Sequence, residues 1–267
     1  MKSKPISRLS FPLASAIAAL LAVQSVSATN YYWDVNGTTA GFSTVVGAWN
    51  GTNAFWGPNA SGTGGTYIAS PTTSDDLFVT AAATNTGSIT LTGTQSAGSL
   101  TFGATVGAVT LTGGTALDLG AAATIAASNW QQSNVISMAI TGAGTSLTKI
   151  GNGGLNLQGA NTYSGETILN GYWQLGNTTI SGAAGTISTS SGITFNGTLL
   201  TLTNVATQGA VDRLNSSAAS LITSNGGTLN YGNANTAASS TVTDSINSSI
   251  GQSSAATSSQ GRPSAPR

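Results

Sequence analysis

In one stretch of this sequence, glycine and asparagine interrupt each short apolar segment, and this pattern limits the folds that the chain can form. Between Ser146 and Asn177, apolar and polar residues alternate in three short segments, each ending within three or four residues at Gly or Asn. Alternation with period two predicts β-strands with one buried face, and the Gly and Asn clusters predict tight turns with positive φ. A helix is not expected here, because Gly falls within nearly every helical turn.

The spacing of these segments predicts how the strands are stacked. Leu155 and Leu157 recur as Trp173 and Leu175 after an interval that is too short for a crossover helix but suits a chain that stacks strand on strand. Earlier apolar pairs follow one another at about half that interval: Ile89/Leu91, Leu100/Phe102, Val109/Leu111 and Leu117/Leu119. Two such steps give a coil of roughly 17 to 20 residues. The sequence therefore predicts a β-solenoid with coils of about this length.

Residues 146–177 resemble one full copy of the autotransporter-associated β-strand repeat, also called the passenger-associated transport repeat, of Gram-negative bacteria. The matching residues are Leu147-Thr148-Lys149, Gly151-Asn152-Gly153-Gly154-Leu155 and Gly159-Ala160-Asn161-Thr162-Tyr163-Ser164-Gly165. Two positions depart from the pattern: Glu166 stands where the family usually has a small residue, and Tyr172-Trp173 replace a small residue and Leu. The resemblance implies a right-handed parallel β-helix on an exported protein, and it implies no particular reaction.

Residues 1–28 have the pattern of a signal peptide. Lys2, Lys4 and Arg8 precede the apolar stretch Leu9–Val23, and Val26-Ser27-Ala28 offers small residues for a cut after Ala28. A membrane anchor is the alternative, but the stretch is broken by Pro12 and is shorter than the roughly 20 residues that span a bilayer. We expect cleavage after Ala28 and no membrane span in the rest of the chain.

The remainder is predicted to be all-β. We expect an N-terminal aromatic-rich cap and first coils in residues 29–86, a solenoid in residues 87–232, and a flexible low-complexity tail in residues 233–267. Disorder throughout is the alternative, since charged residues make up only 5% of the chain and Gly, Ser, Thr and Asn replace them. Disordered chains, however, combine low hydrophobicity with high charge, whereas this chain is 39% hydrophobic with alternating apolar residues.

Charge and cysteine content exclude some partners and some means of stabilisation. Without the signal peptide, four basic and seven acidic residues remain, a net charge of −3. No basic residue lies between Arg8 and Lys149, so nucleic acid is not expected as a partner. Since the chain has no Cys, we expect hydrogen-bond ladders and stacked side chains, rather than disulfides, to hold it together.

Aromatic residues are concentrated in the first part of the predicted mature chain, between residues 31 and 78. Two interpretations are open. Trp33, Trp49 and Trp56 could contact a glycan, which would make this part a carbohydrate-binding module. Alternatively, the aromatic residues could cover the open end of the first coil, since large aromatic side chains bury the most area per residue.

The sequence offers little for catalysis or metal binding, and we expect no catalytic, cofactor or metal site. It has no His, which removes the commonest general base and metal ligand. A polysaccharide lyase or hydrolase would need converging carboxylates, and among the acids only Asp75 and Asp76 are neighbours. The segment from Gly113 to Leu119, with Asp118, echoes a Ca²⁺-binding nonapeptide but lacks its third Gly and occurs once.

Two further expectations concern the repeat-like segment. Lys149 and Glu166 could form an ion pair, but we expect Lys149 to be solvated or to cap a strand ladder. Trp173 and Leu175 are expected to point inward, with Tyr172 and Gln174 outward.

The function predicted from the sequence is that of an exported structural protein of a Gram-negative bacterium, a passenger-like scaffold that is secreted or lies at the cell surface. Adhesion to a surface or extracellular polymer and end-to-end self-association are its expected interactions.

Overall fold

The computed structural model describes residues 28–81, 85–176, 185–204, 213–214, 221–233 and 249–252. These residues form nineteen strands and contain no helix, so the predicted all-β class is confirmed. Within these ranges no helix is long and apolar enough to cross a membrane.

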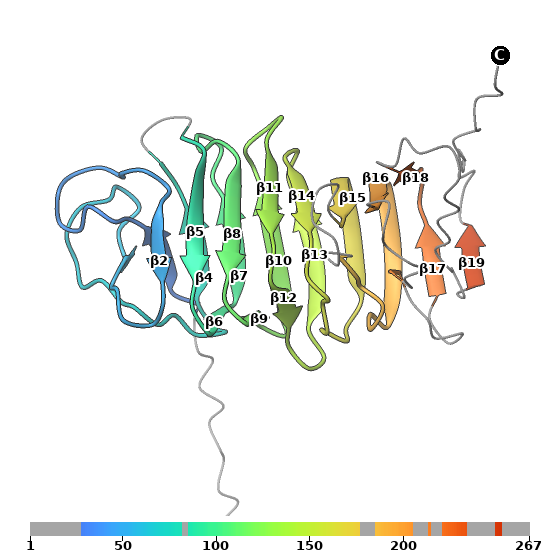
Figure 1. Cartoon of the computed structure of the whole chain (residues 1–267), viewed down its shortest axis with the longest axis horizontal. Coiled ribbons are helices and arrows are strands. Elements are labelled where there is room, and N and C mark those ends of the chain that lie inside the picture. Colours follow the sequence, from blue (N-terminus) through green and yellow to red (C-terminus); the bar gives the residue numbers. More distant parts are fainter. Residues whose placement is uncertain are drawn as a thin grey trace, which may run out of the picture.

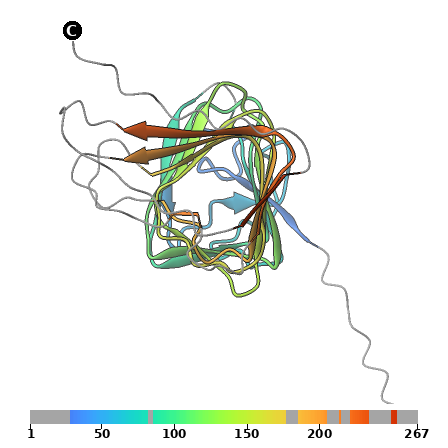
Figure 2. The same cartoon turned by 90° about the vertical axis from the view of Figure 1, so that its right-hand side faces the viewer.

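The strands stack along one axis as a parallel β-solenoid, seen from the side in Figure 1 and along the axis in Figure 2. Three faces wind around this axis. Face A contains β1 (Asn30–Trp33), β4 (Asp76–Val79), β7 (Ser99–Phe102), β10 (Ala122–Ala127), β13 (Ser146–Ile150), β17 (Leu221–Ser224) and β19 (Ser249–Gln252). Face B contains β2 (Gly47–Trp49), β5 (Gly87–Leu91), β8 (Val109–Gly113), β11 (Ser133–Ile136), β14 (Gly154–Leu157) and β18 (Gly227–Asn233). Face C contains β6 (Thr94–Ala97), β9 (Ala116–Leu119) and β12 (Ala139–Thr141).

Two long strands join faces A and B. The first half of β15 (Thr167–Leu175) pairs with β13, and its second half pairs with β14. The next strand, β16 (Gly192–Asn204), pairs along most of β15 across a register shift between Asn170 and Tyr172. Faces A and B therefore form one sixteen-stranded sheet, whereas face C is a separate three-stranded sheet.

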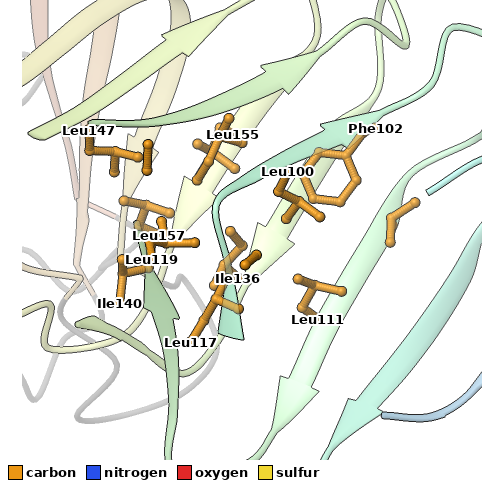
Figure 3. Packing of buried hydrophobic residues seen from close by; sticks show 14 of the residues in the cluster. Leu100, Phe102, Leu111, Leu117, Leu119, Ile136, Ile140, Leu147, Leu155 and Leu157 are labelled. Carbon is orange, nitrogen blue, oxygen red and sulfur yellow. The ribbon is translucent and has the colours of Figure 1, made fainter. Parts of the chain in front are cut away.

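Alternate residues of all three faces fill the interior, as Figure 3 shows for ten labelled side chains. The sequence predicts four apolar pairs whose two side chains point to the same side of a strand. All eight side chains are buried, and none is more than 3% exposed: Ile89/Leu91, Leu100/Phe102, Val109/Leu111 and Leu117/Leu119. Burying one such side chain contributes about 1.5–3 kcal/mol. This stacked core, together with the parallel ladders, holds the fold.

The predicted coil length is wrong for most of the solenoid. Leu155 does pair with Trp173, as the predicted interval requires. However, Ile89 pairs with Leu111 and Leu100 pairs with Ile125, and both partners lie further along the chain than a coil of the predicted length would place them. The prediction of two strands per coil found β9 of face C through Leu117/Leu119 but missed β6, which points Gln95 and Ala97 inward and so shows no apolar pair. In this part a coil has three strands.

Glycine makes the corner between faces A and B in four successive coils. Gly151, Gly171, Gly197 and Gly226 have φ of +84°, +71°, +62° and +88°, a region that other residues enter only with strain. The expected role of Gly at corners is confirmed at these positions.

Short strands lie at both ends of the described chain. At the N-terminal end, the two-residue strand β3 (Trp56–Gly57) pairs antiparallel with β1, on the opposite edge of β1 from β4. Within the stretch predicted to be a tail, β19 pairs with β17, so these four residues depart from that expectation. The rest of that stretch beyond Asn233, like the predicted signal peptide up to Ser27, lies outside the described residues.

Candidate functional site

The three tryptophans proposed as glycan contacts lie together inside the N-terminal end. Trp33, Trp49 and Trp56 are 1%, 1% and 0% exposed. The Trp56 ring meets the rings of Trp33 and Trp49 edge-on, with centroids 5.0 Å apart in both pairs. Their faces are packed against protein, so none of them offers a surface on which a sugar could stack. This arrangement matches the alternative interpretation, an aromatic cap over the first coils.

A polar network ties this cap together. The Tyr67 hydroxyl shares its single proton between the carboxylate of buried Asp34, at 2.7 Å, and the Gly37 carbonyl. Burial, reinforced by this hydrogen bond and by the charge of Asp34, raises the pKa of Tyr67 to about 12. Gly57 lies so close under the Tyr67 ring that an added Cβ would be 2.7 Å from a ring carbon. Tyr67 is therefore held in place by its neighbours and has a structural role.

The five described carboxylates each accept a hydrogen bond from a hydroxyl group close by. The pairs are Asp34 with Tyr67, Asp75 with Thr72, Asp76 with Ser99, Asp118 with Thr141, and Glu166 with Thr194. Asp75 and Asp76 bond to different partners, and Asp118 lies half-buried on the outside of β9. Among the described residues, no group of three or more His, Cys, Asp or Glu side chains could hold a metal ion.

Lys149 and Glu166, the suggested ion pair, have separate partners. Lys149 is buried, and its Nζ donates to the carbonyls of Gly151 at 2.8 Å and Asn170 at 3.1 Å. Glu166 is exposed on the outside and bonds Thr194. Of the two roles expected for Lys149, solvated or capping a strand ladder, the structure shows the second. The capping ammonium lies inside the solenoid. Burial lowers the pKa of this ammonium to about 8.

The Asn-Thr-Tyr-Ser-Gly segment connects neighbouring coils through Asn161. This side chain, 2% exposed, accepts a hydrogen bond from the backbone N–H of Ile140 in the preceding coil at 2.8 Å. Its amide donates to the carbonyl of Thr186 in the following coil, also at 2.8 Å. One side chain therefore bridges three successive coils, which explains why an amide with both a donor and an acceptor stands here.

The tyrosine and glycine of the segment also act between coils. The buried Tyr163 hydroxyl bonds Thr167, which in turn bonds Ser190 in the next coil at 2.8 Å. Burial raises the pKa of Tyr163 above its usual range. At Gly165 an added Cβ would be 2.3 Å from the Thr145 carbonyl oxygen, so only Gly fits. The segment is a structural coupling between coils and shows no open ligand site.

One exposed residue was missed from the sequence. Trp130, which lies in a stretch where the sequence shows only an irregular pattern of apolar residues, is 71% exposed, whereas the other four tryptophans are at most 1% exposed. The signal available was its setting between Asn129 and two glutamines, which indicates a polar turn rather than a strand.

Comparison with known proteins supports the resemblance in coarse terms. The chain is 36% identical over 157 residues to the protein named adhesin BmaC autotransporter of Brucella suis biovar 1 (strain 1330). The match covers 58% of this chain but only 4% of that adhesin. No protein-family model matches the chain, and no solved structure matches it. The chain is thus a parallel β-solenoid similar to a short part of an autotransporter adhesin.

Proposed function

We propose that this protein is an exported, surface-located scaffold of the autotransporter-passenger type that takes part in adhesion. The observation that carries the proposal is the similarity to an autotransporter adhesin over more than half of the chain. The parallel solenoid supports it, because a stack of coils gives long outward faces that can contact another surface. The leader expected in residues 1–28 supports export.

The outward side chains fit a role in contact rather than in chemistry. On face A one outward row runs through Ser99, Thr124, Thr148, Ile168 and Thr194 in successive coils. Hydroxyl groups dominate this row, and the described carboxylates are bonded to neighbouring hydroxyls. Such a surface offers many neutral donors and acceptors in a regular array.

The proposal is tested by following export and adhesion separately. The full chain is produced in a non-adherent Gram-negative laboratory strain, and the medium, the intact cells and the protease-treated cells are probed for it. A variant lacking residues 1–28 is the control and should stay inside the cell. Protection of the full chain from protease on intact cells, together with its absence from the medium, would contradict the proposal.

Adhesion is measured with beads coated with the purified chain, so that anchoring to a cell is not required. We expect coated beads to attach to cultured cells or to immobilised extracellular material above the level of beads coated with an unrelated β-protein. A Leu155→Asp variant, which places a charge in the core, should lose this attachment together with its folded structure. Equal attachment by the folded chain and the unrelated protein would contradict an adhesive role.

A further inference from the structure

Trp130 is held on the outside of the solenoid by a rigid turn between faces A and B. The Gln132 N–H bonds the Asn129 carbonyl at 3.1 Å, and Gln131 has φ of +61°. A positive φ at the third residue alone fits a type II turn, where Gly is the usual choice. Among the described residues Gln131 is the one non-glycine with positive φ, a conformation that is strained for an L-residue.

Two buried side-chain amides hold this turn in place. Asn129 and Asn134, 1% and 0% exposed, each donate to the side-chain oxygen of the other at 2.8 Å. Asn129 also donates to the Gly107 carbonyl in the preceding coil, and Asn134 donates to the Gly154 carbonyl in the following coil. The turn is therefore anchored to the coils on both sides, and its backbone holds Trp130 at one position on the outside of the solenoid.

The exposed indole forgoes the stabilisation that burial of a large aromatic side chain provides. The other four tryptophans of the chain are all buried. Trp is enriched among the residues that dominate binding energy at interfaces.

The surroundings of Trp130 indicate what chemistry it would meet. Ser128, Gln131 and Ser133 flank it in the chain, Asn152 stands at the same corner in the next coil, and all four are exposed. They supply neutral hydrogen-bond donors and acceptors at the same corner as Trp130. A sugar matches this arrangement, because its C–H face packs on the electron-rich face of an indole while its hydroxyl groups bond the amides.

Charge restricts the partner further. The two basic side chains in the described part of the chain, Lys149 and Arg213, are both 0% exposed. The described surface therefore offers no cation that would attract an acidic polymer.

We propose that Trp130 is the stacking platform of a binding site for neutral polysaccharide, at the corner between faces A and B. The inference rests on the proposed adhesive function and names its partner class. The proposed sugar contact is therefore the exposed Trp130, which the sequence analysis did not single out, and not the buried tryptophans of the cap.

Affinity electrophoresis of the purified full chain tests this, with gels that contain a soluble β-glucan, a galactomannan or, as the acidic comparison, an alginate. We expect retardation by at least one neutral polysaccharide and none by alginate. Trp130→Ala should weaken the retarding interaction by at least about tenfold, whereas Trp130→Tyr should keep most of it. Leu199→Ala is the matched control, since Leu199 is a 37% exposed apolar residue further along the same stack of coils, and it should leave binding unchanged.

Folding and self-association are followed on the same samples. Because Trp130 is exposed, its variants should melt as the parent does, and iodide should quench its fluorescence unless polysaccharide covers it. Retardation by no neutral polysaccharide, or equal retardation of Trp130→Ala, would overturn the inference. So would a dimer in sedimentation that Trp130→Ala dissociates, because the partner would then be a second copy. If polysaccharide binds but coated beads do not attach to cells, the adhesive function fails while the site stands.

Discussion

Lys149 and Asn170 exchange hydrogen bonds between neighbouring coils. The ammonium of Lys149 donates to the backbone carbonyl of Asn170 at 3.1 Å, and the side-chain amide of Asn170 donates to the backbone carbonyl of Lys149 at 2.7 Å. The ammonium also donates to the carbonyl of Gly151. A buried ammonium whose acceptors are carbonyl groups is costly to keep charged.

This relationship predicts that stability rises with pH in mildly alkaline solution. Burial lowers the pKa of folded Lys149 to about 8, against an ordinary value of 10.5. Between these values the unfolded chain binds more protons than the folded chain, so the free energy of unfolding increases with pH. Urea unfolding at about one-unit pH intervals checks this, and Lys149→Met should flatten the rise. An unchanged slope in Lys149→Met would assign the effect to another group.

Above about pH 10 we expect the trend to reverse. Burial raises the pKa of Tyr67 to about 12 and raises that of Tyr163 above its usual range, so the folded chain holds protons that unfolded tyrosines lose near 10.0. The free energy of unfolding then falls as pH increases. Tyr163→Phe should weaken this fall, and it should leave the rise due to Lys149 in place.

The inward residues of the strands could be predicted from sequence, because apolar side chains two residues apart carry the information locally. The length of a coil could not, since β6 directs Gln95 and Ala97 inward and has no apolar signature. The burial of Lys149 and the exposure of Trp130 were missed for a related reason. Each reverses the usual relation between polarity and burial, and only contacts with neighbouring coils determine that reversal.

The hydrogen bonds of Asn161 to two neighbouring coils predict that removing this one side-chain amide lowers the stability of the chain. Asn161→Ala removes the acceptor for the Ile140 N–H and leaves that buried group unpaired, at a cost of about 1–3 kcal/mol. Thr162→Ala, at an exposed neighbouring position, should cost less than about 0.5 kcal/mol. Thermal and urea unfolding of the two variants give the comparison. Equal stability would mean that water can replace the bridge.

Substitutions at two glycines distinguish the effect of steric crowding from that of backbone strain. At Gly165 a methyl group would collide with the Thr145 carbonyl oxygen, whereas at Gly197 nothing lies within 4 Å but φ is +62°. Gly197→Ala should therefore cost about 1–2 kcal/mol, the penalty for an L-residue in this conformation. We expect Gly165→Ala to cost more, because the backbone of the adjacent coil must move. The reverse order in urea unfolding would contradict the close approach of these coils.

The final prediction concerns Trp173, which is 0% exposed and pairs with Leu155 on one side and Leu200 on the other. The predicted parity is confirmed, since Leu175 is also buried while Tyr172 and Gln174 are half-buried on the outside. Trp173→Ala should cost about 3–5 kcal/mol, the range for emptying a large buried aromatic site. Gln174→Ala should cost less than about 0.5 kcal/mol.

Tyr172 is the informative control for this prediction. It points outward, but its ring covers Gly154, where an added Cβ would lie 2.7 Å from a ring carbon. Tyr172→Ser should therefore destabilise the chain less than Trp173→Ala and more than Gln174→Ala. Since the stability of a solenoid is nearly a sum over neighbouring coils, hydrogen exchange in Trp173→Ala should increase first in β14, β15 and β16. Faster exchange in Tyr172→Ser than in Trp173→Ala would mean that Tyr172, and not Trp173, points into the interior of this coil. The substitution that loosens the packing between coils must be at the side chain that fills the interior.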